Sequence, residues 1–291
     1  MQLLRGRETS KAIRTEILTE TNKLLAKGFR NPHLAAVLVG TDAPSRTYVA
    51  AKVKACKEVN FKSTLIELDE DIKETDLLAT IEDLNKNDDI DGFIVQLPLP
   101  NHIDENKILL AIDPKKDIDG FHPTNVGKMC LELETFIPAT PHGILELLKR
   151  YNIETSGKNI AVLGRSHIVG RPISILLGQK HAKGNATVSL LHSRTKNIEA
   201  YTRKADIIIA AIGIPKFLKP DMVKEDVILI DVGITRIKND TKKSGYELVG
   251  DIDFEAIKYK ASYITPVPGG VGPMTIAMLL KNTLQAARLS E

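Results

Sequence analysis

The stretch Asn159-Ile160-Ala161-Val162-Leu163-Gly164-Arg165-Ser166-His167-Ile168-Val169-Gly170-Arg171-Pro172 predicts how the second half of the chain folds. An apolar run predicts a strand that ends at Gly164, and the apolar residues after it recur at helical spacing. A strand, a glycine turn and a helix direct backbone N–H groups and the helix dipole at a phosphate, as in dinucleotide-binding folds. Because Gly164 and Gly170 do not match the G-x-G-x-x-G fingerprint, a strand-to-helix connection without a ligand also fits this turn.

The next predicted strand, 186–191, ends at His192-Ser193-Arg194-Thr195. At this position an acidic residue binds the ribose of NAD, whereas an arginine accommodates the 2′-phosphate of NADP. No acid is present here, and Ser193, Arg194 and the more distant Arg165 supply donors that suit a phosphate. Each arginine alone also fits a solvated loop. Both together, at the two places where such a fold needs them, favour NADP as the cofactor.

Composition restricts the class of protein. The chain has 291 residues, enough for two domains, and its 43% apolar and 26% charged residues are typical of a globular protein. A net charge of +3 and an aromatic content of 4% predict no nucleic-acid partner. Two cysteines indicate a reducing compartment. With no secretory signal and no apolar run of about 20 residues in view, we expect a cytoplasmic protein without a membrane span.

Strands alternate with helices in both halves of the chain, which predicts an α/β fold of parallel βαβ units. Strands are expected at 34–39, 61–68, 92–96, 160–163, 207–211 and 227–232, and helices at 8–27, 44–59, 74–86, 103–111 and 143–150. The prolines at 138 and 141 indicate a boundary, and the last helix has an apolar face with which it can return to the first domain. We therefore expect one domain from 1–140 and 273–291, and the other from 141–272.

Helix 44–59 carries the first candidate catalytic residues, Tyr48 and Lys52, one turn apart on one face. We expect the stripe of Val49, Val53 and Cys56 to face the core, so Tyr48 and Lys52 lie at its edge. Partial desolvation there would disfavour the charged lysine and make it a better base. An ordinary Tyr–Lys surface pair fits the same spacing.

Polar residues also follow the third predicted strand, where ligands of open α/β sheets bind. Gln96 is followed by Leu97 and Pro98 in a proline-stiffened turn that suits the wall of a site, and it can hold a lysine amine or a heterocycle, or anchor its own loop. Asp119 can accept two parallel N–H bonds from a 2-amino-4-oxo heterocycle, while Asp117 fits a turn cap. The histidines and cysteines show no metal-ligand spacing, so we expect no metal.

Motifs spread over nearly the whole chain resemble the bifunctional methylenetetrahydrofolate dehydrogenase/cyclohydrolase family. The most specific motifs are Val95–Pro100, Lys116–Gly120 and Pro266–Thr275. The resemblance implies NADP-dependent oxidation of 5,10-methylenetetrahydrofolate to 5,10-methenyltetrahydrofolate, followed by hydrolysis to 10-formyltetrahydrofolate. It also implies two α/β domains flanking a cleft, the second a Rossmann-like NADP-binding domain, and a homodimer formed through the cofactor domain.

The resemblance further implies the roles of particular residues. Lys52 would be the acid/base of hydrolysis, with Tyr48 stacking on the folate and Gln96 tuning the lysine as the other two catalytic residues. Substrate would also contact Leu97, Pro98, Asp119, Pro268, Gly269 and Gly270. The dinucleotide would be held by Gly164, Arg165, Ser166, Ser193, Arg194 and Ile234.

The chain departs from the family pattern at two places. Ala139 stands where the family often has a cysteine, and residues 181–184 form a small insertion that could alter the approach to the adenosine end of the cofactor. Two other functions remain open. A dehydrogenase without hydrolytic activity is disfavoured by the intact Lys52 and Gln96, and a regulatory protein that binds NADP without turnover would not need these residues.

Overall fold

The computed structural model describes residues 1–242 and 245–289, which form two compact units. We call residues 11–139 and 276–289 the Lys52 unit, and residues 1–10 and 140–275 the Gly164 unit, leaving out 243–244. The chain passes between them within helices α1 (Gly6–Ala26), α6 (Ala139–Arg150) and α10 (Val271–Leu289). The domain limits expected from the sequence stay a prediction, and residues 290–291 of that prediction lie outside the described residues.

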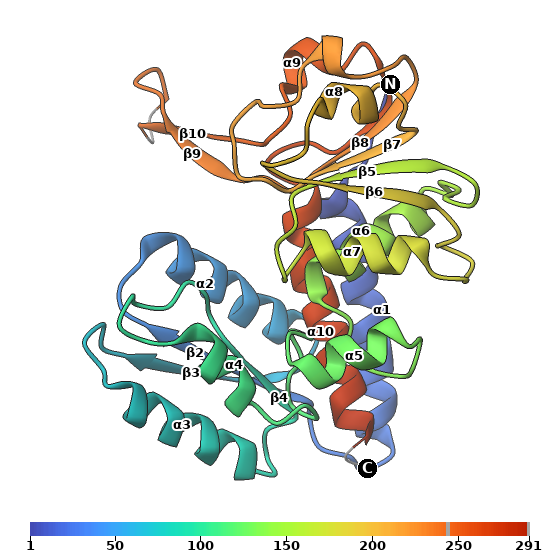
Figure 1. The fold of residues 1–291 in the computed structure, drawn as a ribbon. Helices are drawn as coiled ribbons and strands as arrows, with labels where there is room; N and C mark the ends of the chain where they lie inside the picture. The colour runs from blue at the N-terminus through green and yellow to red at the C-terminus, as the bar shows by residue number, and fades with distance from the viewer. Residues whose placement is uncertain (243–244, 290–291) are drawn as a thin grey trace. The chain divides into compact units, whose positions relative to one another are not determined.

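The Lys52 unit is built on a described three-stranded sheet in the order β3-β2-β4, with all strands parallel. Its strands are β2 (His33–Val39), β3 (Lys62–Leu68) and β4 (Gly92–Val95), and its shorter helices are α2 (Ala43–Glu58), α3 (Glu74–Lys86), α4 (Glu105–Ala111) and α5 (Pro123–Cys130). Helix α2 covers one face of the sheet, and α3 and α4 cover the other (Figure 1). Strand β2 is therefore buried along its whole length, as parallel strands between two helical layers are.

The Gly164 unit contains a six-stranded parallel sheet in the order β1-β11-β8-β7-β5-β6 among the described residues. Its strands are β1 (Gln2–Leu3), β5 (Asn159–Leu163), β6 (Thr187–Leu191), β7 (Ile207–Ala210), β8 (Val227–Asp231) and β11 (Ala261–Ile264). Helices α6 and α7 (Gly170–Gly178) lie on one face of the sheet, and α8 (Ile198–Thr202) and α9 (Phe254–Ile257) lie on the other (Figure 1). This is the doubly wound arrangement of dinucleotide-binding domains, so the predicted α/β class is confirmed.

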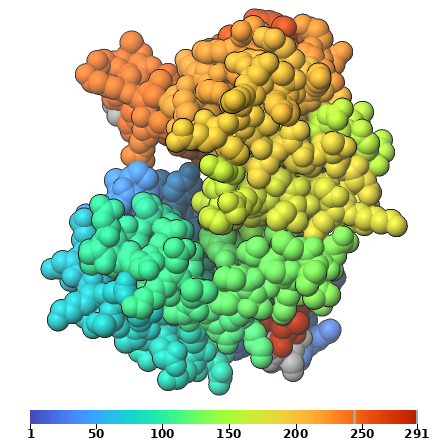
Figure 2. Space-filling view, in the orientation of Figure 1, coloured from blue at the N-terminus to red at the C-terminus, as the bar shows by residue number. Residues whose placement is uncertain are grey.

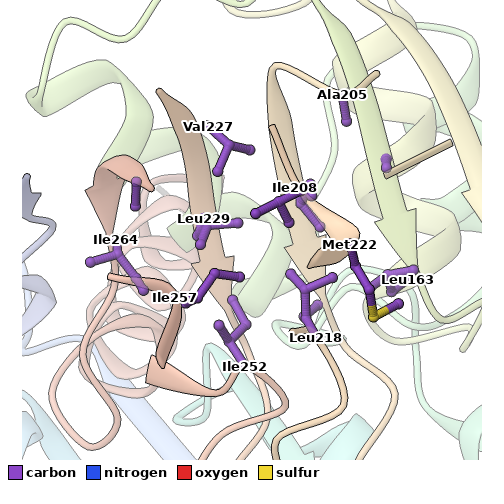
Figure 3. Packing of buried hydrophobic residues seen from close by; sticks show 14 of the residues in the cluster. Leu163, Ala205, Ile208, Leu218, Met222, Val227, Leu229, Ile252, Ile257 and Ile264 are labelled. Carbon is purple, nitrogen blue, oxygen red and sulfur yellow. The ribbon is translucent and has the colours of Figure 1, made fainter. Parts of the chain in front are cut away.

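A buried apolar cluster holds the second of these helical layers on the sheet of the Gly164 unit. Ile208 and Leu229 project from the central strands and meet Leu218, Ile252 and Ile257 from the connections that follow (Figure 3). These side chains are fully or almost fully buried. The segment around Ile252, which includes the carboxylate of Asp251, is thus fixed against the sheet.

A short antiparallel hairpin, β9 (Thr235–Lys238) with β10 (Tyr246–Val249), stands out from the rest of the Gly164 unit (Figure 2). The Arg236 guanidinium lies over the ring of Tyr246, 4.8 Å from its centroid. No pattern in the sequence predicts this hairpin. Among the described residues, none of the helices has the length and apolar composition of a membrane-spanning helix.

Candidate active site

Lys52 lies on α2, a helix with a strong start signal. The Asp42 carboxylate accepts a hydrogen bond from Ser45 N at 2.9 Å and so caps the helix. The buried side chains of α2 include Ser45, Val49, Lys52 and Cys56, which share one face of the helix. Lys52 is only 9% exposed and belongs to this buried stripe. The prediction that Lys52 lies at the edge of this stripe is wrong, because α2 is rotated about its axis so that Lys52 faces the sheet together with Val49 and Cys56.

Lys52 contacts the residue that follows strand β4. Its Nζ donates a hydrogen bond to Gln96 Oε1 at 3.1 Å, and Gln96 Nε2 donates to Leu97 O at 2.7 Å. The second bond fixes the orientation of the amide, so that its oxygen faces the lysine. The structure thus brings together two of the three residues predicted to be catalytic.

Asp119 reaches the same edge of the sheet by a different route. Phe93 of β4 pairs in parallel with Asp117, and Phe93 N donates to Lys116 O at 3.0 Å. Parallel neighbours run in the same direction, so the chain after Asp117 leads Asp119 toward the carboxyl end of β4, the end that Gln96 follows. The Asp119 carboxylate and the Lys52 ammonium interact electrostatically there.

Burial dominates the acid–base properties of this cluster. Burial lowers the pKa of Lys52, and the Asp119 charge opposes this only in part. Burial also raises the pKa of Asp119, which the lysine in turn partly opposes. A lysine with a lowered pKa is more often neutral and can accept a proton. Cys56 is no competing nucleophile, because burial raises the pKa of its thiol to about 12.

Asp117 fixes the loop that carries Asp119. It is buried and accepts hydrogen bonds from Phe121 N at 3.2 Å, His122 N at 2.8 Å and Asn125 Nδ2 at 2.8 Å. Burial raises its pKa to about 6, against the lowering effect of these donors. These contacts match the turn-capping role that the sequence left open for Asp117.

Two further contacts restrain this loop. Gly120 has a φ of +73°, and a Cβ built on it would lie 2.8 Å from Phe136 O, so the residue after Asp119 must be glycine. Asn282 of α10 is buried and donates from Nδ2 to Ile118 O at 2.8 Å and to Ile137 O at 2.9 Å. Asn282 was not predicted from the sequence, because a single asparagine on an apolar helix face carries no local signal.

Other predicted substrate residues of the Lys52 unit are more accessible. Tyr48, one turn before Lys52, is 40% exposed. Leu97 is half-buried, Pro98 is exposed, and the peptide bond between them is cis. These positions leave surface for a ligand next to the lysine, and their contacts with a substrate stay a prediction.

The Gly164 unit has a pocket of about 350 Å³ whose lining includes Gly164, Arg165, Ser166, Ser193 and Ile212. It lies where strand order reverses, between β5 and β7, which is the ligand position of doubly wound sheets. The residues that line this pocket do not include Arg194, Ile234 or the turn at 181–184.

Close backbone contacts explain the unusual glycine spacing in this turn. Gly164 has a φ of +106°, and a Cβ on it would lie 2.1 Å from Ala211 O. A Cβ on Gly170 would lie 2.0 Å from Gly164 O. Ser166 Oγ accepts from Val169 N at 3.2 Å and so helps to form the start of α7. Both glycines are therefore needed to fold the turn tightly, without the usual fingerprint.

The remaining predicted cofactor and substrate residues lie on turns of the same unit. Arg194 is exposed, in a turn where its N donates to His192 Nδ1 at 3.1 Å. Ile234 is 40% exposed and lies between β8 and β9. In the loop of Pro268, Gly269 and Gly270, the oxygen of Gly269 accepts from Arg7 N at 2.9 Å. No group of three or more His, Cys, Asp or Glu residues suited to a metal ion occurs in the described part of the chain.

Comparison with protein families accounts for both units. Residues 4–119 match the catalytic domain of tetrahydrofolate dehydrogenase/cyclohydrolase, and residues 138–291 match its NAD(P)-binding domain. The chain belongs to this family. The family and enzyme class predicted from the sequence motifs are confirmed, and a regulatory protein without turnover is not supported.

Relatives of the family agree along the full length. The bifunctional protein FolD of Flavobacterium johnsoniae is 62% identical over 289 residues, which cover 99% of this chain and 98% of that protein. The crystal structure of bifunctional FolD from Campylobacter jejuni has a TM-score of 0.93 and 49% identity, with 99% of each chain covered. The Trypanosoma brucei dehydrogenase-cyclohydrolase, solved with NADP cofactor and inhibitor, has a TM-score of 0.92 and 39% identity, covering 98% of this chain and 97% of its own.

Proposed function

We propose that this chain carries out both reactions of its family with NADP. It oxidises 5,10-methylenetetrahydrofolate to the 5,10-methenyl cation as NADP⁺ becomes NADPH. It then adds water to the methenyl carbon, which gives 10-formyltetrahydrofolate and releases a proton. Membership of the family and the NADP complex of the Trypanosoma brucei relative support this pair of reactions.

The observation that carries the hydrolytic half is the buried Lys52 with its hydrogen bond to Gln96. Neutral Lys52 takes the proton of the attacking water, because burial lowers the pKa of its ammonium. Gln96 holds the lysine at the end of the sheet where the Asp119 carboxylate accepts two parallel N–H bonds from the pterin. Tyr48, Leu97 and Pro98 supply the accessible surface beside the lysine.

The glycine turn fits a dinucleotide. A Cβ at Gly164 would collide with backbone, and the pocket beside it is lined by Arg165, Ser166 and Ser193. These residues would hold the pyrophosphate and ribose, and Arg194 would pair with the 2′-phosphate, whose two charges suit a guanidinium. NADP supplies the hydride acceptor when it is bound. Ile234 and the loop Pro268–Gly270 complete the set of residues that we assign to the ligands.

We further infer that the protein acts in the cytoplasm as a homodimer formed through the Gly164 unit. Strand β6 supports this, because it is one of the two edge strands of the described six-stranded sheet, and edge strands invite pairing with another chain. Light scattering after size exclusion should give twice the 32.0 kDa mass of one chain, and a mass of one chain would refute the dimer.

Replacing Gln96 by leucine tests the hydrolytic assignment. The variant removes the acceptor of the Lys52 hydrogen bond, so hydrolysis of methenyltetrahydrofolate should fall at least tenfold with NADP affinity unchanged. Asn106→Leu, an amide lost from an exposed position of α4, is the matched control and should hydrolyse like the original protein. Hydrolysis by Gln96→Leu at the rate of the control would contradict the assignment.

A further inference from the structure

Two buried carboxylates lie behind the dinucleotide pocket, at the ends of strands β7 and β8. Asp231 is 3% exposed and Asp251 is fully buried. The Asp231 carboxylate accepts hydrogen bonds from Asp251 N at 2.9 Å, Ile252 N at 2.9 Å and Gly233 N at 3.1 Å. Asp231 therefore fixes the backbone around Asp251 to the end of β8.

Asp251 in turn holds the chain that leaves β7. Its Oδ2 accepts from Ile212 N at 2.7 Å and from Gly213 N at 3.0 Å. Its Oδ1 is buried and has no hydrogen-bond partner among the described residues. The two carboxylates thus form a continuous set of hydrogen bonds that joins the end of β8 to the segment of Asp251, and this segment to the turn after β7.

Two glycines leave room for these carboxylates. A Cβ on Gly233 would lie 2.3 Å from Asp251 Oδ1, and a Cβ on Gly250 would lie 1.9 Å from Asp231 Oδ2. Ile252 anchors the same segment in the apolar cluster (Figure 3). The carboxylates occupy space that any side chain at these glycines would fill, so their close approach is a feature of the fold.

The turn held by Asp251 forms one wall of the pocket. Ala211 and Ile212 line it, together with Gly164 and Arg165 of the glycine turn. A Cβ built on Gly164 would lie only 2.1 Å from Ala211 O, so the turn after β7 packs directly against Gly164. A movement of the turn after β7 therefore changes the pocket directly and removes the support of Gly164.

We propose that Asp251, fixed by Asp231, is the positioning residue that sets NADP affinity, by holding the Ile212–Gly213 turn as a wall of the pocket. This inference rests on the proposed binding of NADP at Gly164. Asp251 acts through backbone N–H groups and touches neither the cofactor nor the substrate. The property that matters is its acceptor oxygen, because two buried donors depend on it.

The charge of Asp251 is not required for this role. The described hydrogen bonds of both carboxylates come from backbone N–H groups, and burial, with a contribution from the Asp251 charge, raises the pKa of Asp231 to about 7. An asparagine at 251 keeps one oxygen for Ile212 and Gly213 and removes the repulsion. A leucine has similar volume and no acceptor.

The test compares Asp251→Leu with Asp251→Asn in the full-length protein, with NADP affinity measured by calorimetric titration. The leucine variant should raise the Kd and KM for NADP at least tenfold. Its hydrolysis of methenyltetrahydrofolate should stay within twofold of the original protein, a selectivity that general loss of structure would not give. The asparagine variant should stay within threefold in both measurements.

Unchanged NADP affinity in the folded leucine variant would overturn the inference. So would an asparagine variant that loses NADP affinity tenfold, and this holds even if the leucine variant does not fold. Failure of the original protein to bind NADP would instead refute the proposed function, so the two failures are distinguishable.

Discussion

Replacement of Lys52 by methionine separates catalysis from stability. Proton transfer by a positioned side chain is worth about 10²–10⁴ in rate, or about 3–5 kcal/mol of barrier, so hydrolysis of methenyltetrahydrofolate should fall by that factor. The variant loses a hydrogen bond of about 1 kcal/mol to Gln96, but it also removes an ammonium whose pKa burial lowers. Gln96 is half-buried and water can replace the lost donor. The free energy of unfolding should therefore change by less than about 2 kcal/mol.

The assay follows decay of the methenyl absorbance after mixing with enzyme, with urea unfolding and NADP titration on the same preparations. Lys54→Met is the matched control, because Lys54 is on the same helix but exposed. We expect the control to hydrolyse like the original protein and both variants to bind NADP normally. Hydrolysis by Lys52→Met within threefold of the control would refute the role given to Lys52.

Three other predictions address the cofactor and the fold. Arg194→Ala should weaken NADP binding about tenfold or more, the worth of a charge-assisted hydrogen bond, while NAD binding changes less than about threefold; calorimetry showing equal losses would remove Arg194 from the 2′-phosphate site. Gly120→Ala should lower the free energy of unfolding in urea by about 2–4 kcal/mol, because Gly120 has a φ of +73° and a new Cβ would clash with Phe136 O. Gly28 has a φ of +88° but open space around it, so Gly28→Ala should lower this free energy by only about 1–2 kcal/mol. Similar losses for the two variants would show that the backbone around Gly120 moves to relieve the clash. Burial raises the pKa of Asp231 to about 7 in the folded protein, so its contribution to the free energy of unfolding is fully present below about pH 4. This contribution is lost as the pH rises through 7, by at most about 4 kcal/mol. Asp251→Asn should make this loss smaller, and a pH dependence of urea unfolding that the variant leaves unchanged would contradict the coupling of the two carboxylates.

The sequence predicts the parts of this fold that depend on local pattern. The helix 74–86 coincides with α3, and the strand and helix around Gly164 were predicted from apolar spacing and glycine punctuation. Helix α5 was missed although Pro123 begins it, because its cap is the unusual side chain of His122. The β9–β10 hairpin was missed because each strand has only four residues, too few for its alternation of side chains to be recognised in the sequence.

Contacts between distant segments could not be predicted in this way. The burial of Lys52 depends on how α2 is rotated against its sheet, and no pattern within the helix fixes that angle. Asn282 reaches Ile118 across 164 positions, and Asp251 reaches Ile212 across 39. The one local hint is a glycine within two positions of an aspartate, at Asp231-Val232-Gly233 and Gly250-Asp251, where the small residue makes room for a buried carboxylate.

The central claim is that one chain performs an NADP-linked oxidation and the hydrolysis that follows it. The direct measurement adds methylenetetrahydrofolate with NADP, or separately NAD, and records nicotinamide reduction and methenyl absorbance together. We expect reduction with NADP to exceed that with NAD, and the methenyl compound to decay faster than it does in buffer. Reduction accompanied by methenyl that decays only at the buffer rate would contradict the hydrolytic role of the Lys52 unit. No reduction with either nucleotide would contradict the claim as a whole.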